Sequence, residues 1–329
     1  MSWTENILSY AGGVVHALER LFFGAGSFLS PLPLFAAGAI AALVLISRQR
    51  KTGQTVSMRG LFSALFPAAV WRHRSARHDL FIILINDGLL FFLPAMVVIA
   101  ISPLGAVFSD AATEAVQPSP WKMALFGIYL ALAWDFFATF AHYLKHKIPV
   151  LWEFHKVHHC AEVLTPLTAM RRHPVEIVIS SLIVGAGIGV VTMVWTVIFG
   201  APGSTFEVGG VALIVYLWRL VGYNIRHSHI WISYGPFWNR FLMSPAHHQL
   251  HHSRDARHYD YNFGHIFTIW DRLFGTLYQP VEGEVFEYGI EHEENAELNT
   301  LAALYIRPLQ KAAARFAPKK TSIPAQPAE

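Results

Sequence analysis

Long apolar runs limit what this chain can fold into more than any other feature of its sequence. About 20 helical residues are needed to cross the hydrocarbon core of a bilayer, which is about 30 Å thick. Five windows of suitable length are almost free of charge, and they cover residues 28–47, 80–101, 121–141, 175–199 and 206–223. Only 14% of the 329 residues are charged, against about 25% in an ordinary soluble domain. The sequence therefore predicts an all-α protein, built as an integral membrane helical bundle.

The basic residues indicate how these five spans are oriented. If the chain crosses the membrane at each window, the loops on one face hold 22 of its 25 Lys and Arg residues. Segments 102–120 and 200–205, on the other face, hold none. Because cytoplasmic loops retain Lys and Arg, we expect the N-terminus outside and the C-terminus in the cytosol. A bacterial inner membrane and the endoplasmic reticulum both fit this multi-pass topology.

Histidine is unusually frequent and unevenly placed. Of 18 histidines, 17 fall on the predicted cytosolic face. We therefore expect a cytosolic, histidine-rich helical cap on the bundle. The formal net charge of +3 is too small to indicate a nucleic-acid partner. The single cysteine, Cys160, cannot form a disulfide within the chain.

Three histidine clusters have the spacing of metal ligands. They are His142 and His146 (H-x-x-x-H), His155, His158 and His159 (H-x-x-H-H), and His248, His251 and His252 (H-x-x-H-H). On a helix, residues four apart share a face while the middle histidine of H-x-x-H-H is turned away, so each triplet can serve two neighbouring ions. A random chain with this histidine content would hold about 0.05 copies of H-x-x-H-H. Two copies, embedded among apolar residues rather than in a low-complexity tract, favour metal binding over chance.

Four further residues are candidates for the same site. His227, after the last window, is expected to supply one more ligand, whereas its neighbour His229 is a weaker candidate. His173 either ligates or caps the start of the window at residue 175. Asp135, inside a window, either accepts a hydrogen bond from a histidine of another cluster or bonds a neighbouring helix. No catalytic residue is expected beyond the metal ligands.

Nine neutral nitrogen ligands exceed the needs of one four-coordinate zinc ion and indicate a pair of ions. No H-E-x-x-H pattern supplies the general base of a zinc hydrolase. The alternative from another class is a histidine-rich membrane metal transporter or sensor. Transporters place ionisable ligands inside their spans near the bilayer midplane, whereas here the ligands gather at one face.

The histidine clusters and their surroundings resemble the fatty acid hydroxylase/sterol desaturase superfamily of membrane histidine-box di-iron oxygenases. The resemblance covers about residues 80–280 and includes segment 151–159 around the second box and segment 270–276 near the end. It also includes the H-P-x-E element that begins at His173, and His227 after the last window. His229 stands where many members have Asn, Gly or Glu, so no ligand role is carried over to it.

The resemblance implies a non-heme iron enzyme that hydroxylates or desaturates a C–H bond of a lipid with O₂ as co-substrate. It also implies two iron ions and an external electron donor, such as a ferredoxin or a cytochrome b5-type protein with its reductase. No flavin-binding G-x-G-x-x-G is expected within the chain. The identity of the lipid and the choice between hydroxylation and desaturation stay open.

The chain is expected to have three regions. Residues 1–79 form an anchor span and a basic segment suited to an anionic membrane surface, residues 80–280 the catalytic domain, and residues 281–329 a cytosolic tail.

Overall fold

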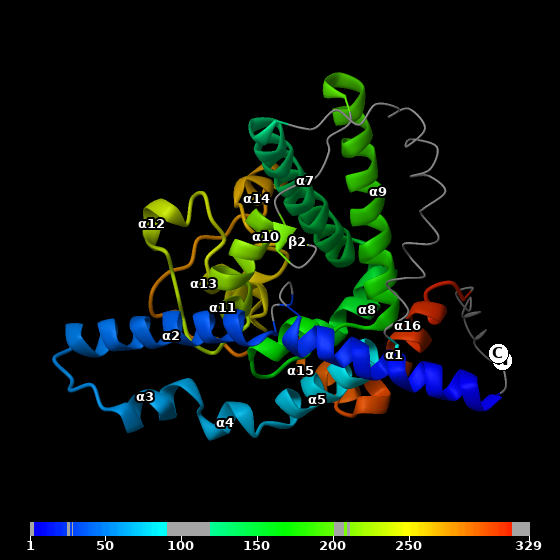
Figure 1. Ribbon diagram of the computed structural model, residues 1–329. Coiled ribbons are helices and arrows are strands. Elements are labelled where there is room, and N and C mark those ends of the chain that lie inside the picture. The colour runs from blue at the N-terminus through cyan, green and yellow to red at the C-terminus, as the bar shows by residue number, and fades with distance from the viewer. Residues whose placement is uncertain are drawn as a thin grey trace, which may run out of the picture.

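The computed structural model describes residues 3–24, 27, 29–90, 119–200, 207–208 and 211–317. Their regular secondary structure is almost entirely helical (Figure 1). The exceptions are two short antiparallel strands, β1 (Glu207–Val208) and β2 (Val211–Ala212). The predicted all-α fold is confirmed.

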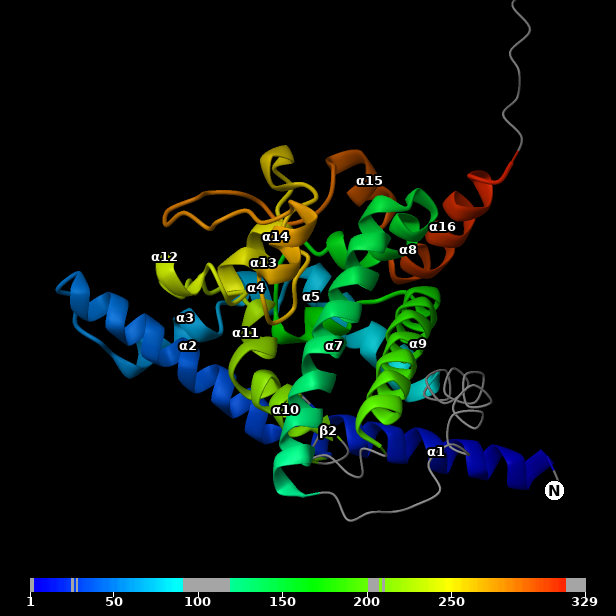
Figure 2. The ribbon, with the colours of Figure 1, turned by 90° about the horizontal axis from the view of Figure 1, so that it is seen from above.

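Two long apolar helices, α7 (Pro120–Lys147) and α9 (Pro174–Phe199), stand side by side at the centre of the molecule (Figures 1 and 2). Each begins with a proline in its first turn, where the missing N–H would have no helical partner in any case. Gly187 of α9 allows the close approach, because a Cβ at this position would lie 2.4 Å from the ring of Phe137.

A third helix of suitable length and hydropathy, α2 (Pro31–Lys51), lies differently from this pair. Among the described residues, α2, α7 and α9 are the three helices long and apolar enough to cross a membrane. In both ribbon views α2 and α1 (Trp3–Phe23) run crosswise to α7 and α9 (Figures 1 and 2). Among the described helices, the membrane bundle is therefore built on α7 and α9, and α2 runs in a different direction from this pair.

The structure agrees with some of the predicted spans and not with others. The windows at residues 28–47, 121–141 and 175–199 coincide with α2, α7 and α9. The window at 80–101 begins in α5 (Arg74–Ile83) and continues as the π-helix η1 (Leu84–Leu89), and its residues after 90 lie outside the described part of the chain.

The fifth span, predicted as one helix over residues 206–223, is wrong. The described part of this region forms β1 and β2, then α10 (Leu213–Trp218), the π-helix η3 (Arg219–Tyr223) and α11 (Asn224–Arg226). The helical run from 213 to 226 is too short to cross about 30 Å of hydrocarbon. Two adjacent glycines, Gly209 and Gly210, explain the error, because each costs about 1 kcal/mol in a helix and average hydropathy does not register this.

Short helices gather around the C-terminal end of α7 and the N-terminal end of α9 and form the histidine-rich cap (Figure 2). They are α8 (Pro149–His159), the 3₁₀ turn η2 (Pro166–Met170), α13 (Pro245–His251), α14 (Ile269–Phe274), α15 (His292–Glu297) and α16 (Leu301–Ala314). The remaining described helices are α3 (Met58–Leu65), α4 (Ala68–Trp71), α12 (Gly235–Trp238) and the 3₁₀ turn η4 (Ala256–His258).

The described part of the expected tail, residues 281–317, packs against the cap. Helix α16 lies on α8 and α5, and Leu304 is buried with Ile82, Val157 and Cys160 in one apolar cluster. The side of α8 that faces away from the histidines is therefore supported by the C-terminal helix.

Candidate metal centre

The structure brings all nine predicted histidine ligands together in two neighbouring clusters. The first cluster contains His142, His146, His155, His159 and His251, and the second contains His158, His227, His248 and His252. Within each cluster one ring nitrogen of every histidine lies within 4.8 Å of the others. Sequence spacing alone did not assign these residues to one cluster or the other.

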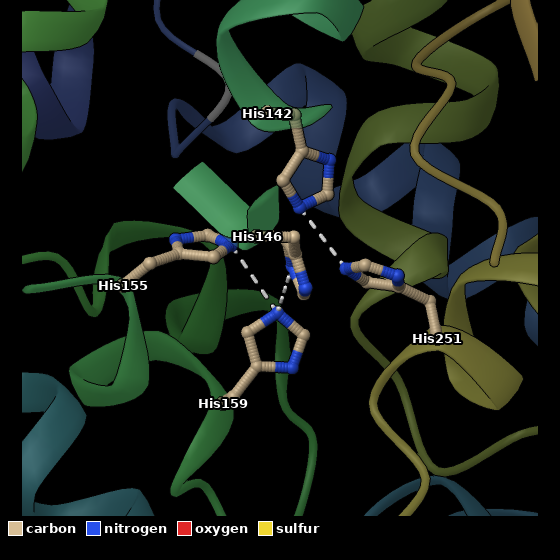
Figure 3. Close-up of side chains that lie close together, drawn as sticks. All are labelled: His142, His146, His155, His159 and His251. Atoms are coloured by element: carbon tan, nitrogen blue, oxygen red, sulfur yellow. Dashed lines mark hydrogen bonds between the residues drawn. The ribbon is translucent and has the colours of Figure 1, made fainter. Parts of the chain in front are cut away.

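The five-histidine cluster joins three helices (Figure 3). His142 and His146 come from α7, His155 and His159 from α8, and His251 from α13. The Nε2 atoms of His142 and His251 are 3.0 Å apart, and that of His159 lies 3.1 Å from His146 Nε2 and 3.2 Å from His155 Nε2. Two nitrogens bound to one ion at right angles, each about 2.1 Å from it, are about 3.0 Å apart. The observed separations therefore suit neighbouring ligands of one ion.

The four-histidine cluster has similar geometry. His227 Nε2 lies 3.3 Å from His158 Nε2 and 2.7 Å from His248 Nε2, and the Nε2 atoms of His248 and His252 are 3.1 Å apart. The ring centroid of His252 is 4.5 Å from those of both His158 and His159, so the two clusters touch. Two ions held here would be close neighbours.

Helical geometry divides each H-x-x-H-H triplet between the clusters. His155 and His159 lie one turn apart and enter the five-histidine cluster, whereas His158 is turned toward the other. The triplet of α13 divides in the opposite sense, with His251 alone in the five-histidine cluster. This is the division that helical spacing predicts for triplets that serve two ions.

The nitrogens on the outer side of several rings are held by the surrounding protein. His142 Nδ1 donates to the carbonyl of Phe263 over 2.8 Å, and His251 Nδ1 donates to the carbonyl of Tyr261 over 2.7 Å. Because a carbonyl oxygen can only accept, the proton of each neutral ring lies on Nδ1 and its Nε2 lone pair faces the cluster.

His248 has a different outer partner. Its Nδ1 lies 2.7 Å from Nη2 of Arg226, which also donates to the carbonyl of Gly264. A guanidinium can only donate, so in the metal-free protein Nδ1 of His248 accepts and the proton of the neutral ring lies on Nε2, which has to release it before it can bind an ion. Arg226 is buried and had no predicted role, and its position directly before His227 is the only signal that the sequence offers for it.

Glu176 holds a ligand and a lysine together. Its Oε1 accepts from His155 Nδ1 over 2.9 Å and from Lys145 Nζ over 2.7 Å, and its side chain is 1% exposed. In the sequence, Glu176 was identified only as part of the H-P-x-E element. The sequence does contain a signal for this role: a carboxylate in the first turn of an apolar span needs a buried partner.

Burial keeps the cap histidines neutral. Desolvation first, and then neighbouring histidines and basic side chains, hold the pKa of each of seven ligand histidines well below 6.5: His155, His158, His159, His227, His248, His251 and His252. Neutral imidazole is the form that binds metal.

The three less certain candidates lie outside both clusters. His173 caps α9, since its Nδ1 accepts from the N–H of Val175 over 3.2 Å, and its Nε2 contacts the carbonyl of Tyr305 over 3.0 Å. His229 Nε2 contacts the carbonyl of Ala64 over 2.9 Å. Neither histidine points a free nitrogen at the centre.

Asp135 bonds the segment that follows the last cluster. Its carboxylate accepts from the N–H groups of Ile266 and Phe267, over 2.7 and 3.1 Å, and from Trp270 Nε1 over 2.7 Å. Asp271 holds the same segment, because it accepts from the N–H of Phe263 over 2.8 Å. The two carboxylates thus position the carbonyl that fixes the ring of His142.

We expect Asp135→Ala to destabilise the protein and lower its metal content. The change leaves three donors unpaired, each at a cost of about 1–3 kcal/mol when buried, and frees the segment that orients His142. Thermal unfolding in detergent and metal analysis would measure both effects. Glu287→Ala, at an exposed site, is the control, and equal melting temperatures for the two variants would contradict this role.

Two cavities reach the histidines from different sides. The larger, of about 420 Å³, lies between α7, α9 and α11 and touches His142, His155, His158, His227 and His248. The smaller, of about 240 Å³, touches His146, His159 and His251. The two sets of lining residues have no member in common.

His265 also lines the larger cavity. Its ring lies edge-on to those of His142 and Trp134, with centroids 5.8 Å apart in both cases.

Comparison with known proteins agrees with this arrangement. The fatty acid hydroxylase family matches residues 127–276, which include both clusters. The chain is 28% identical to human alkylglycerol monooxygenase over 179 residues, which is 54% of this chain and 35% of that protein. It is 27% identical to the ornithine lipid hydroxylase of Rhizobium tropici over 53% of this chain and 48% of that protein. It is 26% identical to rat lathosterol oxidase over 48% of this chain and 47% of that protein.

The chain thus spans between a third and a half of the length of these relatives, and no solved structure matches it. The relatives are named for oxidations of different lipids. The family match and these relatives together identify residues 127–276 as a domain of the fatty acid hydroxylase/sterol desaturase superfamily.

Proposed function

We propose that this protein is an integral-membrane non-heme di-iron oxygenase that hydroxylates or desaturates a lipid C–H bond. The observation that carries the proposal is the pair of adjacent clusters of buried, neutral histidines at the end of two apolar helices. The activities for which the relatives are named, which are all oxidations of lipids, support it.

The proposed ligands divide between two ions as the two clusters do. One ion would be held by His142, His146, His155, His159 and His251, and the other by His158, His227, His248 and His252. The all-imidazole donor set suits a redox-active first-row metal such as iron. When bound, the iron pair would supply the O₂ activation that no side chain of this chain can supply.

Protein side chains hold the site ready for an unreactive substrate. The larger cavity touches ligands of both clusters, among them His155 and His158, so one bound molecule can face both ions. It lies between α7 and α9, which are both long and apolar enough to cross a membrane, so we propose that a lipid enters it from the bilayer without crossing water.

The reaction needs reducing equivalents from another protein. Hydroxylation inserts one oxygen atom of O₂ into the C–H bond and reduces the other to water, which consumes two electrons and two protons. We propose a ferredoxin or a cytochrome b5-type protein with its reductase as the donor, and O₂ as the co-substrate.

The same charge distribution supports a cytosolic position for the cap. The loops and helices that carry the histidines also carry most of the Lys and Arg residues, and cytoplasmic segments retain these residues. We propose that the N-terminus is outside, and that the membrane is a bacterial inner membrane or the endoplasmic reticulum.

The rival function, a metal transporter or sensor, places its ligands differently. Transport sites lie near the bilayer midplane between broken helices. Here His142 and His146 lie in the last turns of α7, and the other seven histidines lie in the cap.

Metal analysis combined with a lipid assay tests the proposal. Gently purified protein should contain two irons per chain, and with donor, reductase and ¹⁸O₂ it should convert an added lipid to a product that carries one ¹⁸O atom or one new double bond. Zinc in place of iron, or metal uptake into vesicles without lipid oxidation, would refute the proposal.

A further inference from the structure

The larger cavity has a polar end and an apolar end. Helix α9 lines it with Glu176, Ser180, Ser181, Val184 and Gly185, which lie at i, i+4, i+5, i+8 and i+9 and so share one helix face. Along about 14 Å of helix the strip changes from a carboxylate, through two hydroxyls, to apolar residues.

Helix α7 lines the opposite wall with the same gradient. Lys145 and His142 lie near the cap, followed by Ala141, Ala138 and Trp134 farther along the helix. The polar end of the cavity is therefore the end at which the histidines lie. A cavity made only for hydrocarbon would have apolar residues at both ends.

Several polar atoms at this end lack a partner within the protein. Among the described residues, no hydrogen bond reaches Glu176 Oε2, Ser180 Oγ or Arg172 Nε, and all three residues line the cavity. The Glu176 side chain is 1% exposed. Buried polar atoms are almost always paired, so a polar group of a bound molecule is the partner that this wall fits.

The excess of positive charge at this end of the cavity favours a ligand whose oxygen atoms accept hydrogen bonds. Lys145, Arg172 and Arg226 line it, against the single carboxylate of Glu176, which Lys145 already binds. No ion pair of Arg172 occurs among the described residues. A group rich in oxygen acceptors, such as a glycerol or a phosphate, complements this wall.

We propose that the polar end of the cavity binds the oxygen-rich headgroup of the lipid substrate, so that the enzyme oxidises a carbon close to the headgroup. This inference rests on the proposed oxygenase function and adds to it the position of attack. Glu176, which contacts His155 over 2.9 Å, lies one helical turn from Ser180. A headgroup at Arg172 and Ser180 therefore leaves only its nearest carbons beside the ligand histidines.

The opposite binding mode would bring a chain terminus to the histidines. Methylene groups would then cover Arg172, Ser180 and Glu176 and remove them from water without supplying a hydrogen bond. Each such group costs about 1–3 kcal/mol, which opposes tail-first binding. The apolar end, at Val184 and Trp134, is the part of the cavity that suits a hydrocarbon chain.

Binding to metal-free protein in nanodiscs tests the inference without turnover. Three probes share one C16 chain: 1-O-hexadecylglycerol, its 3-phosphate, and hexadecane. We expect one or both headgroup lipids to bind more tightly than hexadecane, and the better of the two tells whether a hydroxyl or a phosphate is the preferred source of oxygen. Equal affinity for hexadecane would overturn the inference.

Two variants locate the headgroup. Ser180→Val and Arg172→Gln should each weaken binding of the preferred headgroup lipid about tenfold, the cost of one hydrogen bond of about 1.4 kcal/mol, and leave hexadecane binding and iron content unchanged. Thr196→Val is the control, because its hydroxyl bonds the carbonyl of Thr192 on its own helix. Unchanged headgroup binding in both variants would contradict the assignment.

Product analysis separates this inference from the proposed function. In the iron-loaded protein the new oxygen or double bond should lie within a few bonds of the headgroup. Oxidation near the far end of the chain would refute this inference but would still agree with the proposed oxygenase function. Headgroup-selective binding without any lipid oxidation would instead refute the oxygenase and retain the binding site.

Discussion

Replacing His158 or His251 with alanine abolishes lipid oxidation and lowers the iron content. Each change removes one imidazole from a different cluster. Loss of a group that only orients a metal ligand typically costs 10–100-fold in affinity or activity, so the loss of a ligand should cost more than about 100-fold. His158→Ala leaves three imidazoles in its cluster whereas His251→Ala leaves four, so the loss of iron should be greater for His158→Ala.

Iron analysis and turnover of the two variants, at the same level of detergent-solubilised protein, measure these effects. His229→Ala is the matched control, because this histidine lies close in sequence to His227 but contacts the carbonyl of Ala64 outside both clusters. A double variant of His158 and His251 that kept two irons and full turnover would disprove the assignment of the nine ligands.

Metal-free protein loses stability steeply as the pH falls below 6.5. In the folded protein, burial holds the pKa of the seven cap ligands well below 6.5 and lowers the pKa of His247 to about 3. In the unfolded chain, histidine has a pKa of about 6.5. Above this pH both states are neutral at these positions, and stability does not depend on their titration.

Below pH 6.5 the unfolded chain binds protons that the folded chain does not, so unfolding becomes more favourable. The free energy of unfolding falls by about 1.4 kcal/mol per pH unit for each histidine that stays neutral in the folded state. Because several histidines act together, the apparent melting temperature of metal-free protein should fall sharply between pH 7 and 5.

Melting curves of metal-free and iron-loaded protein across this pH range provide the measurement. Bound iron stabilises the folded state by mass action, so the loaded protein should melt at a higher temperature at pH 7 and lose the difference as protons displace the metal. A metal-free protein whose melting temperature is flat from pH 7 to 5 would show that the imidazoles are not buried together.

The sequence predicted best what depends on neighbouring residues. The H-x-x-H-H spacing determines which imidazoles share a helix face, and the structure divides each triplet accordingly. The apolar windows that became α7 and α9 are continuous helices of suitable length. By contrast, the window at 206–223 has sufficient hydropathy but contains Gly209 and Gly210, whose backbone preferences an average over the window hides.

Contacts between distant parts of the chain could not be predicted. Asp135 bonds Ile266, which lies 131 residues later, and no local pattern links the two. The assignment of His251 to the cluster of α7, and the Arg226 contact to His248, likewise depend on how α13 packs against other helices. Tertiary packing, rather than spacing, decides such pairings.

The two separate cavities have a consequence for the order of events in a catalytic cycle. In the proposed function, the lipid would reach His155 and His158 through the larger cavity, whereas the smaller cavity touches His146 and His159 beside Trp152, whose ring centroid is 4.9 Å from that of His146. A donor that approaches on the side of Trp152 does not have to wait for the lipid to leave. Steady-state rates measured against both substrates should therefore give intersecting double-reciprocal lines, as for a ternary complex, rather than the parallel lines of a ping-pong scheme.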